Sequence, residues 1–365
     1  MKITFFIPSL KNGGAERVII ELANHMSKNG HSISLVLATG GDGYKNEIES
    51  SVKIINLNSR KTFRSLFKFC NHIKENKPDG IISALSNANC IALLARKLTR
   101  TNIPIVVSER NISLKDRFKN LSLQQKLIHL SISLLYNEST SIIAVSKGVA
   151  NSISRTYKID SKKIKCIYNP CDMDNLNSLS IKNIEHKWFK YNTKNIILSV
   201  GRLNKQKNYD LLLKAFSIVR KNEDSKLIIL GEGEERERLE NLAIKLGLDE
   251  TCLDMPGFVN NPYAFMKRSE VFVLSSDWEG LPNVVIQALA LNCKIVSTDC
   301  DAGPREILDD GKLGILVEPG NELDLANAIL KSLRRKSQNL LFDRKMSRFD
   351  IKNIALQYIQ SLDIK

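Results

Sequence analysis

Long apolar runs and paired cysteines are both missing from this chain of 365 residues. No stretch of 18 or more apolar residues occurs, so we expect no transmembrane helix. The seven cysteines are scattered and none forms a CxxC pair, which argues against a disulfide framework and a zinc site. They fit a reduced, cytoplasmic compartment. The N-terminal apolar run is short and enters a glycine turn, which predicts a first strand rather than a signal peptide.

Acidic residues are scarce in the first half of the chain. The formal net charge is +15, and residues 1–180 carry 26 of the 54 Lys and Arg but 13 of the 39 Asp and Glu. A basic half indicates an anionic partner such as a membrane surface, a phosphorylated lipid or nucleic acid, unless it only aids solubility. Nucleic acid ranks lowest, because interleaved aromatics and a recognised binding module are missing, and we predict no such partner.

Short apolar runs alternate with helical patterns along the whole chain. "KITFFIPS" precedes "AERVIIELANHMSKNG", and the alternation restarts with "NIILSVG" and "KLIILGEG". This order predicts an α/β protein with parallel sheets and crossover helices. We expect two doubly wound, Rossmann-like domains facing a cleft, 1–171 and 195–340, with a polar linker at 172–194 and a C-terminal amphipathic helix at 341–365. Ligands of such sheets bind beyond the carboxyl ends of the strands.

Glycine-rich turns follow several predicted strands. Gly13 and Gly14 in "PSLKNGGAERVII" and Gly231 in "LGEGEERERLENLA" lie between a strand and a helix, whose first N–H groups favour an anion. The first of these turns is not a GxGxxG fingerprint, and a plain strand-to-helix turn explains it equally well. Phe258 lies in the turn-rich "LDMPGFVNNP", where its ring could stack on a base or pack in the core.

Two cations and a carboxylate lie at predicted strand ends. Arg202 and Lys207 follow the strand in "SVGRLNKQKN" and can clamp a diphosphate, the arginine as a fork and the lysine as a point charge. Glu279 precedes a helix whose first turn suits Pro282 in "EGLPNVVIQALA". Helical side chains lean toward the helix N-terminus, so Gln287 and Glu279 are expected to converge on one ligand through hydrogen bonds.

Taken together, these motifs resemble the family-4 retaining glycosyltransferases of the GT-B fold, which use nucleotide-sugar donors. The residues that carry the resemblance fall in order within 12–321 and read "GGAER", "GRLNKQKN", "LGEGEER", "PGF", "EGLPNVVIQALA", "STDCDAGPREIL" and "GILVEPGN". The chain is most similar to enzymes that extend lipid-linked oligosaccharides, capsules or O-antigens. The resemblance implies transfer of a hexose or N-acetylhexosamine from a UDP-sugar to a glycan on a polyprenyl diphosphate. It also implies that the protein is located in the cytoplasm, peripherally attached to the inner face of the plasma membrane.

The resemblance assigns a role to each motif. Arg202 and Lys207 would hold the donor diphosphate, and Glu279 would contact the transferred sugar. The loop "SERN" would face the acceptor with Glu109 and Arg110. The other predicted donor-binding residues are Gly13, Gly14, Gly231, Phe258, Gly280, Leu281, Pro282, Asn283 and Gln287.

Gln287 departs from the family pattern, because the family has a second glutamate there, in an E-x7-E motif that begins at Glu279. That glutamate contacts the ribose hydroxyls. A glutamine still hydrogen-bonds a diol, but without the stronger charge-assisted bond. We expect weaker donor binding; a protein that binds a nucleotide sugar without efficient transfer is the alternative.

The mechanism implied by the resemblance needs neither a carboxylate pair nor a metal. Retaining glycosidases use two carboxylates about 5 Å apart, but we predict that no second carboxylate of the Glu279 stretch pairs with Glu279. The family is thought to use same-face attack, in which the leaving phosphate helps deprotonate the acceptor and the protein positions groups and stabilises charge. The DxD patterns at 172–174 and 299–301 could hold a divalent cation, yet we predict no metal and no cofactor.

Two basic and apolar stretches bear on membrane binding. "SRKTFRSLFKFCNHIKENK" predicts a face with Phe63, Leu66, Phe67 and Ile73 among cations, and "LKDRFKNLSLQQKLIHLSISLLY" is the second stretch. Basic amphipathic helices can lie on anionic membranes. Packing of both helices against the first sheet is the alternative that the sequence leaves open.

Overall fold

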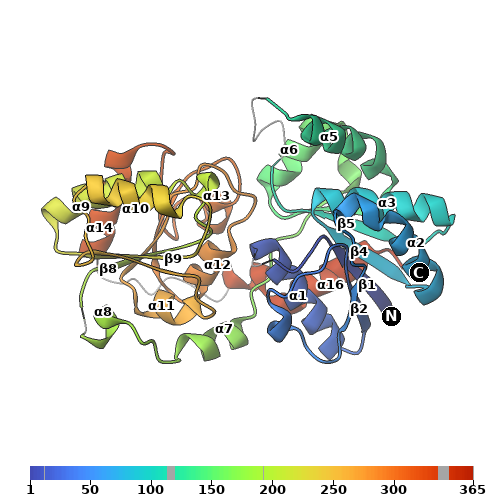
Figure 1. Ribbon diagram of the computed structural model, residues 1–365, viewed down its shortest axis with the longest axis horizontal. Helices are drawn as coiled ribbons and strands as arrows, with labels where there is room; N and C mark the ends of the chain where they lie inside the picture. Colours follow the sequence, from blue (N-terminus) through green and yellow to red (C-terminus); the bar gives the residue numbers. More distant parts are fainter. Residues whose placement is uncertain (12, 113–119, 192, 336–344, 365) are drawn as a thin grey trace. The chain divides into compact units, whose positions relative to one another are not determined.

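The computed structural model describes residues 1–11, 13–112, 120–191, 193–335 and 345–364. The chain divides into two compact units (Figure 1). Unit 1 contains Met1–Pro170 and Ser347–Lys365, and unit 2 contains Cys171–Met346. Each unit is built on one sheet of parallel strands with helices around it, so the predicted fold class of two Rossmann-like domains is confirmed.

Unit 1 has a seven-stranded sheet in the order β3-β2-β1-β4-β5-β6-β7. Its strands are β1 (Lys2–Ile7), β2 (Ser32–Leu37), β3 (Lys53–Asn56), β4 (Gly80–Ala84), β5 (Ile105–Glu109), β6 (Ser141–Ala144) and β7 (Ile164–Cys166). Strand β1 reads KITFFI, and consecutive residues such as Phe5 and Phe6 are both buried. Burial on both faces explains why the strand is a continuous apolar run, as expected for a parallel sheet covered by helices.

Helices cover both faces of the first sheet (Figure 1). They are α1 (Gly14–Lys28), α2 (Leu66–Asn76), α3 (Ser86–Thr99), α5 (Leu123–Leu135), α6 (Lys147–Tyr157) and α16 (Ile351–Ser361). Helix α3 packs between α2 and α5, whereas α1 packs against α16. The sheet therefore has α1 and α16 on one side and α2, α3 and α5 on the other (Figure 1).

Helix α16 returns the end of the chain to unit 1. Ile354, Tyr358 and Leu362 are buried in the same apolar cluster as strands β1 and β2. The helix starts after Asp350, whose carboxylate accepts hydrogen bonds from two backbone N–H groups of the first turn. The amphipathic helix expected at 341–365 thus covers Ile351–Ser361; residues 341–344 and 365 lie outside the described residues.

Unit 2 has a six-stranded sheet in the order β10-β9-β8-β11-β12-β13. Its strands are β8 (Ile196–Val200), β9 (Lys226–Leu230), β10 (Leu253–Gly257), β11 (Val271–Leu274), β12 (Lys294–Thr298) and β13 (Ile315–Val317). The helices that follow β8 include α9 (Tyr209–Asn222), α10 (Arg236–Lys245), α11 (Pro262–Arg268), α12 (Asn283–Ala290) and α14 (Glu322–Arg334). The strand order reverses between β8 and β11, and such a switch point is where doubly wound sheets bind ligands.

The segment 172–194, expected to be a linker, contains two helices, α7 (Met173–Ser180) and α8 (Lys187–Lys190), and belongs to unit 2. Trp188 is buried, and His186 lies 2.8 Å from the carboxylate of Asp254, whose pKa it lowers through that hydrogen bond. Both helices are too short to show a clear apolar period. Their packing is therefore a tertiary feature that the local sequence pattern did not indicate.

We expect Ile354→Ala to lower the free energy of unfolding by about 3 kcal/mol, because the truncation leaves a cavity in the core of unit 1. Urea unfolding followed by circular dichroism measures the change. Leu356→Ala is the matched control, since Leu356 lies on the exposed face of the same helix. Equal destabilisation by the two variants would contradict the packing of α16 described above.

Candidate active site

The candidate site lies where strands β8 and β11 end. These strands pair in parallel, with Ile197 opposite Val271 and Leu198 opposite Phe272, so their carboxyl ends meet at one edge of the sheet. After β8 the chain makes a single 3₁₀ turn, η5 (Lys205–Lys207), and after β11 it forms the loop that carries Glu279. The reversal of strand order brings together two residues that are 72 positions apart in the sequence.

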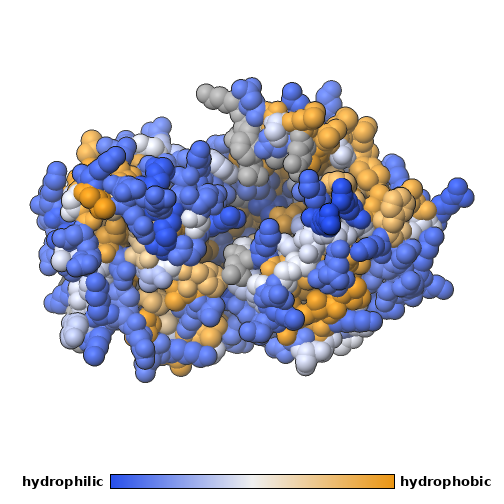
Figure 2. Space-filling view, in the orientation of Figure 1, coloured by the Kyte–Doolittle hydropathy of each residue, from blue (hydrophilic) through white to orange (hydrophobic). Residues whose placement is uncertain are grey.

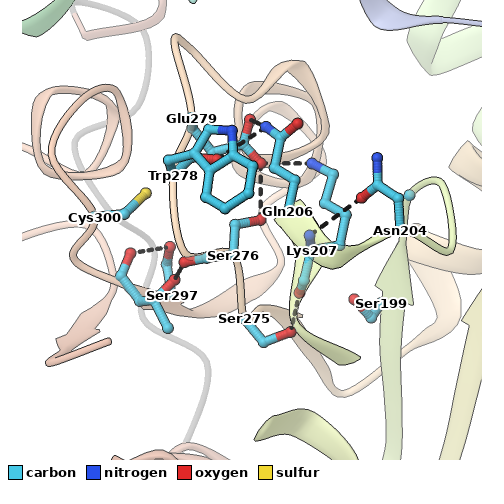
Figure 3. Close-up of polar contacts among 12 residues, drawn as sticks. Ser199, Asn204, Gln206, Lys207, Ser275, Ser276, Trp278, Glu279, Ser297 and Cys300 are labelled. Atoms are coloured by element: carbon cyan, nitrogen blue, oxygen red, sulfur yellow. Dashed lines mark hydrogen bonds and ion pairs between the residues drawn. The ribbon is translucent and has the colours of Figure 1, made fainter. Parts of the chain in front are cut away.

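Lys207 and Glu279 form a largely buried ion pair (Figure 3). The Lys207 Nζ atom lies 2.5 Å from Glu279 Oε1, and the two side chains are only 16% and 8% exposed. Ser276 Oγ donates to the same carboxylate oxygen at 2.8 Å, and Gln206 Nε2 donates to Oε2 at 3.3 Å. A buried carboxylate needs such partners, because the desolvation of an unpaired charge is costly.

Hydrogen bonds to the backbone tie the two loops to each other (Figure 3). Gln206 Nε2 also donates to the carbonyl of Trp278 at 2.9 Å, and Ser275 Oγ donates to the carbonyl of Lys207 at 2.8 Å. The hydroxyl of Thr298 donates to the carbonyl of Ser276 at 2.6 Å. The position of the carboxylate is thus fixed by the surrounding loops before any ligand binds.

Gln206 and Ser276 are site residues that the sequence analysis missed. Gln206 bridges the two loops, and Ser276 hydrogen-bonds the carboxylate that Lys207 neutralises. Both are polar residues close to a strand end, and this placement was the only signal available. It is common to many loops, so it did not single them out.

Arg202 does not join the Lys207–Glu279 pair. Its side chain is 69% exposed and forms an ion pair with Glu234, at 3.2 Å between Nη2 and Oε2. Exposed ion pairs of this kind contribute little to stability. The guanidinium is therefore free to exchange this partner for an anionic ligand at small cost.

Gly231 is required by the close approach of two loops. Its φ angle is +145°, and a Cβ atom built there would lie 2.0 Å from the carbonyl oxygen of Gly201. Only glycine fits that geometry. Gly231 thus packs the turn after β9 against the residue that precedes Arg202. Phe258, directly after β10, is exposed, and its ring is available to a ligand.

The start of helix α12 is the predicted helix mouth. Gly280, Leu281 and Pro282 are buried, and the helix begins at Asn283 with Pro282 as its N-cap rather than within its first turn. The amide of Gln287 donates to the hydroxyl of Tyr263 at 3.4 Å. Gln287 and Glu279 thus have different hydrogen-bonding partners, and their convergence on one ligand stays a prediction.

The remaining predicted residues lie in unit 1. Gly13 is the N-cap of α1 with an extended backbone, and Gly14 is the first helical residue. Glu109 ends β5 with its side chain buried, where it accepts hydrogen bonds from Tyr136, Asn89 and Ser86. Burial, with the nearby Glu109 charge, raises the pKa of Tyr136 well above its ordinary value.

Arg110 is held by two side chains of unit 1. Its Nη1 donates to Asn169 Oδ1 at 2.6 Å, and its Nη2 donates to the hydroxyl of Tyr358 on helix α16 at 3.2 Å. Glu109 and Arg110 are therefore part of internal networks of unit 1. An acceptor would have to bind next to these networks or replace some of their hydrogen bonds.

The two DxD patterns serve local structure. Asp172 caps helix α7 by accepting a hydrogen bond from the N–H of Asn175, and Asp299 forms an ion pair with Arg305. Within the part of the chain that the structure describes, no group of three or more His, Cys, Asp and Glu side chains is arranged to hold a metal ion.

Comparisons with known proteins identify the family of the chain. Residues 12–175 match the family described as Glycosyltransferase Family 4, and residues 180–347 match Glycosyl transferases group 1. The chain is 34% identical, over 88% of its length and 87% of the relative's, to an N-acetylgalactosaminyltransferase of Campylobacter jejuni that acts on a diphospho-undecaprenol-linked sugar. It is 25% identical to the capsular polysaccharide glycosyltransferase CapH of Staphylococcus aureus, over 98% and 99% of the two chains.

Solved structures show the same architecture. HepE of Anabaena in complex with UDP-glucose superposes with a TM-score of 0.82 at 21% identity, covering 100% of this chain and 99% of that one. WaaG, a glycosyltransferase of lipopolysaccharide biosynthesis, superposes with a TM-score of 0.71 at 16% identity, covering 99% and 96%. Fold and site thus define a GT-B protein. The chain belongs to the group 1 and family 4 glycosyltransferases.

We expect Lys207→Met to lower the free energy of unfolding by about 3 kcal/mol, because Glu279 would remain buried without its counter-ion. The double variant Lys207→Met/Glu279→Gln should recover most of this loss, since it removes the unpaired charge. Sugar transfer should be lost in both. Lys312→Met is the control, since its partner Asp309 is at the surface, and its stability should not change. Equal urea midpoints for the single and double variants would refute the coupling.

Proposed function

We propose that the chain is a retaining glycosyltransferase that moves a hexose or N-acetylhexosamine from a UDP-sugar to a glycan on a polyprenyl diphosphate lipid. The buried Lys207–Glu279 pair at the switch point of the second sheet carries the proposal. It provides a fixed carboxylate for sugar hydroxyls beside a cation for phosphate. The relative from Campylobacter jejuni, whose name includes diphospho-undecaprenol, supports the acceptor class, and assembly of a bacterial surface polysaccharide or oligosaccharide follows from it.

In this reaction the protein positions the donor and stabilises the departing diphosphate. Lys207 shares its ammonium group between Glu279 and the phosphate, and Arg202 exchanges Glu234 for a phosphate oxygen. The acceptor oxygen bonds to the anomeric carbon as the bond from that carbon to the phosphate oxygen breaks. The acceptor proton passes to the leaving phosphate, and the products are a glycoside and UDP. Attack on the face that the phosphate leaves retains the anomeric configuration.

The protein supplies the positive charge that this leaving group needs. We propose that two side-chain cations, Arg202 and Lys207, and the first N–H groups of helix α12 would face the diphosphate. Transfer is therefore proposed to proceed without a metal ion or a cofactor. Excess EDTA should leave the initial rate of UDP release unchanged, and a rate that returns only on addition of Mg²⁺ or Mn²⁺ would contradict this part of the proposal.

Gln287 is the residue that bears on whether the protein transfers the sugar or only binds the nucleotide sugar. A glutamine gives the ribose hydroxyls neutral hydrogen bonds where a glutamate would give charge-assisted ones, which are about twice as strong. The chain would then bind its donor weakly but still transfer the sugar, because Lys207 and Glu279 are in place. A protein that binds nucleotide sugar without efficient transfer is the second candidate, and its motivation is this one residue.

The proposed place of action is the cytoplasmic face of the plasma membrane, where a lipid-linked acceptor and a UDP-sugar meet. Among the described residues, none of the helices is both long enough and apolar enough to span a bilayer. Association with the membrane would then be peripheral, through a surface of the folded protein.

Calorimetric titration with UDP, without added metal, tests the donor site. We expect Arg202→Ala to weaken binding about tenfold, since it removes a charge-assisted hydrogen bond. Gln287→Glu should tighten binding several-fold by restoring such a bond to the ribose. Lys312→Ala, an exposed cation of the same unit, should bind like the wild type. Wild-type protein that binds no UDP, or that binds equally well without Arg202, would overturn the donor-site assignment.

Transfer itself is tested with UDP-linked hexoses and N-acetylhexosamines and a polyprenyl diphosphate-linked sugar acceptor. The product of an α-linked donor should be an α-glycoside by proton NMR. An inverted product would contradict the retaining mechanism. UDP binding without transfer to any of these acceptors, restored by Gln287→Glu, would favour the second candidate.

A further inference from the structure

Helix α5 carries four leucines on its outer face. Leu123, Leu127, Leu130 and Leu134 are between 55% and 76% exposed and follow one another at intervals of four, three and four residues. This spacing places them in one stripe along the helix. Lys126 is also exposed on this helix. A surface helix of a globular protein ordinarily turns polar residues outward, so this stripe is unusual.

The stripe is not needed to hold α5 in place. The opposite face of the helix packs against α3 and contributes the buried residues Ile132 and Leu135. Packing on the sheet side therefore already anchors the helix. It does not account for the four leucines that face water, which would cost solubility if they had no partner.

Further exposed apolar side chains lie on α3, which packs against α5, and on α2, which packs against α3. Leu98 on α3 is exposed, as are Phe67 on α2 and Phe63 in the 3₁₀ turn η2 (Thr62–Ser65). Helix α3 contacts η2, α2 and α5. Of the face predicted from the sequence, Ile73 instead packs inward. Seven of the sixteen exposed large apolar side chains among the described residues lie on these elements. We call the surface that these seven side chains form the α5 face. Apolar side chains gather over α5 in Figure 2.

Cations surround the α5 face. Lys61, Arg64 and Lys68 are exposed and interleave with Phe63 and Phe67. A shallow depression at the C-terminal end of α3 is lined by Arg96, Lys97 and Arg100. Its single carboxylate is Glu138, which lies 3.3 Å from Lys97. An apolar stripe with a basic border has the composition of a helix that lies in a membrane interface.

We propose that unit 1 docks on an anionic phospholipid bilayer through the α5 face. The leucines and phenylalanines enter the boundary between headgroups and acyl chains, and the basic border contacts lipid phosphates. Charge selects this partner over a second copy of the chain. Two α5 faces brought together would oppose their basic borders, whereas an anionic bilayer supplies the opposite charge. The inference rests on the proposed function only in that a lipid-linked acceptor requires access to the membrane.

Vesicle flotation tests the proposal on the full chain. The wild type is expected to float with vesicles of phosphatidylcholine and phosphatidylglycerol, and much less with pure phosphatidylcholine or in high salt. Changing all four leucines of the stripe to glutamine should abolish flotation, since each leucine that leaves water contributes about tenfold and the four together about ten-thousandfold. Ile244→Gln on α10 and Leu356→Gln on α16, also exposed, are the matched controls and should float normally.

A second readout separates this proposal from the proposed function. The glutamine variant should bind UDP with wild-type affinity, because α5 carries none of the residues proposed to bind the donor, and Arg202, Lys207 and Glu279 all belong to unit 2. A Leu130→Trp variant should show a blue-shifted emission on addition of the anionic vesicles, since its ring would leave water. Wild-type protein that binds UDP but no vesicles, or a glutamine variant that floats normally, would overturn the docking proposal alone. The docking proposal would also be overturned if the wild type were a dimer and the glutamine variant a monomer. That result would identify a second copy of the chain as the partner.

Discussion

The buried ion pair between Lys207 and Glu279 is the interaction on which the proposed donor site depends. A carboxylate this deeply buried is tolerated only with a counter-ion and hydrogen bonds, and the chain supplies Lys207, Ser276 and Gln206 for this purpose. Since these groups come from loops after two neighbouring strands, the pairing of β8 with β11 sets their spacing. The function of the site is therefore a consequence of the strand order.

The two units differ in the chemistry of the features that they carry. Unit 2 holds the fixed polar site, in which close packing at Gly231 places the loop that carries Arg202. Unit 1 holds most of the excess positive charge and the apolar α5 face, while α16 seals the other side of its sheet. A soluble donor and a membrane-borne acceptor would demand such a division, because one is recognised by hydrogen bonds and charge and the other lies in an apolar phase.

Much of the fold could be predicted because parallel strands covered on both faces are continuous apolar runs. "KITFFIPS" and "NIILSVG" are of this kind, and each begins one of the two sheets in the sequence. The segment 172–194 was harder, since α7 and α8 are short and are stabilised by contacts such as that between His186 and Asp254. Arg202 and Lys207 were both predicted, but only the structure separates the exposed cation from the buried one.

The sequence by itself determined the fold class, the family resemblance and the positions of Lys207 and Glu279 at strand ends, because those features are written in local patterns of apolar and polar residues. The tertiary structure alone decided which side chains meet. Gln206 and Ser276 became site residues through contacts across two loops. The leucines of α5 are the clearest case, since a helix that is apolar on both faces gives no sign of which face will pack against the rest of unit 1.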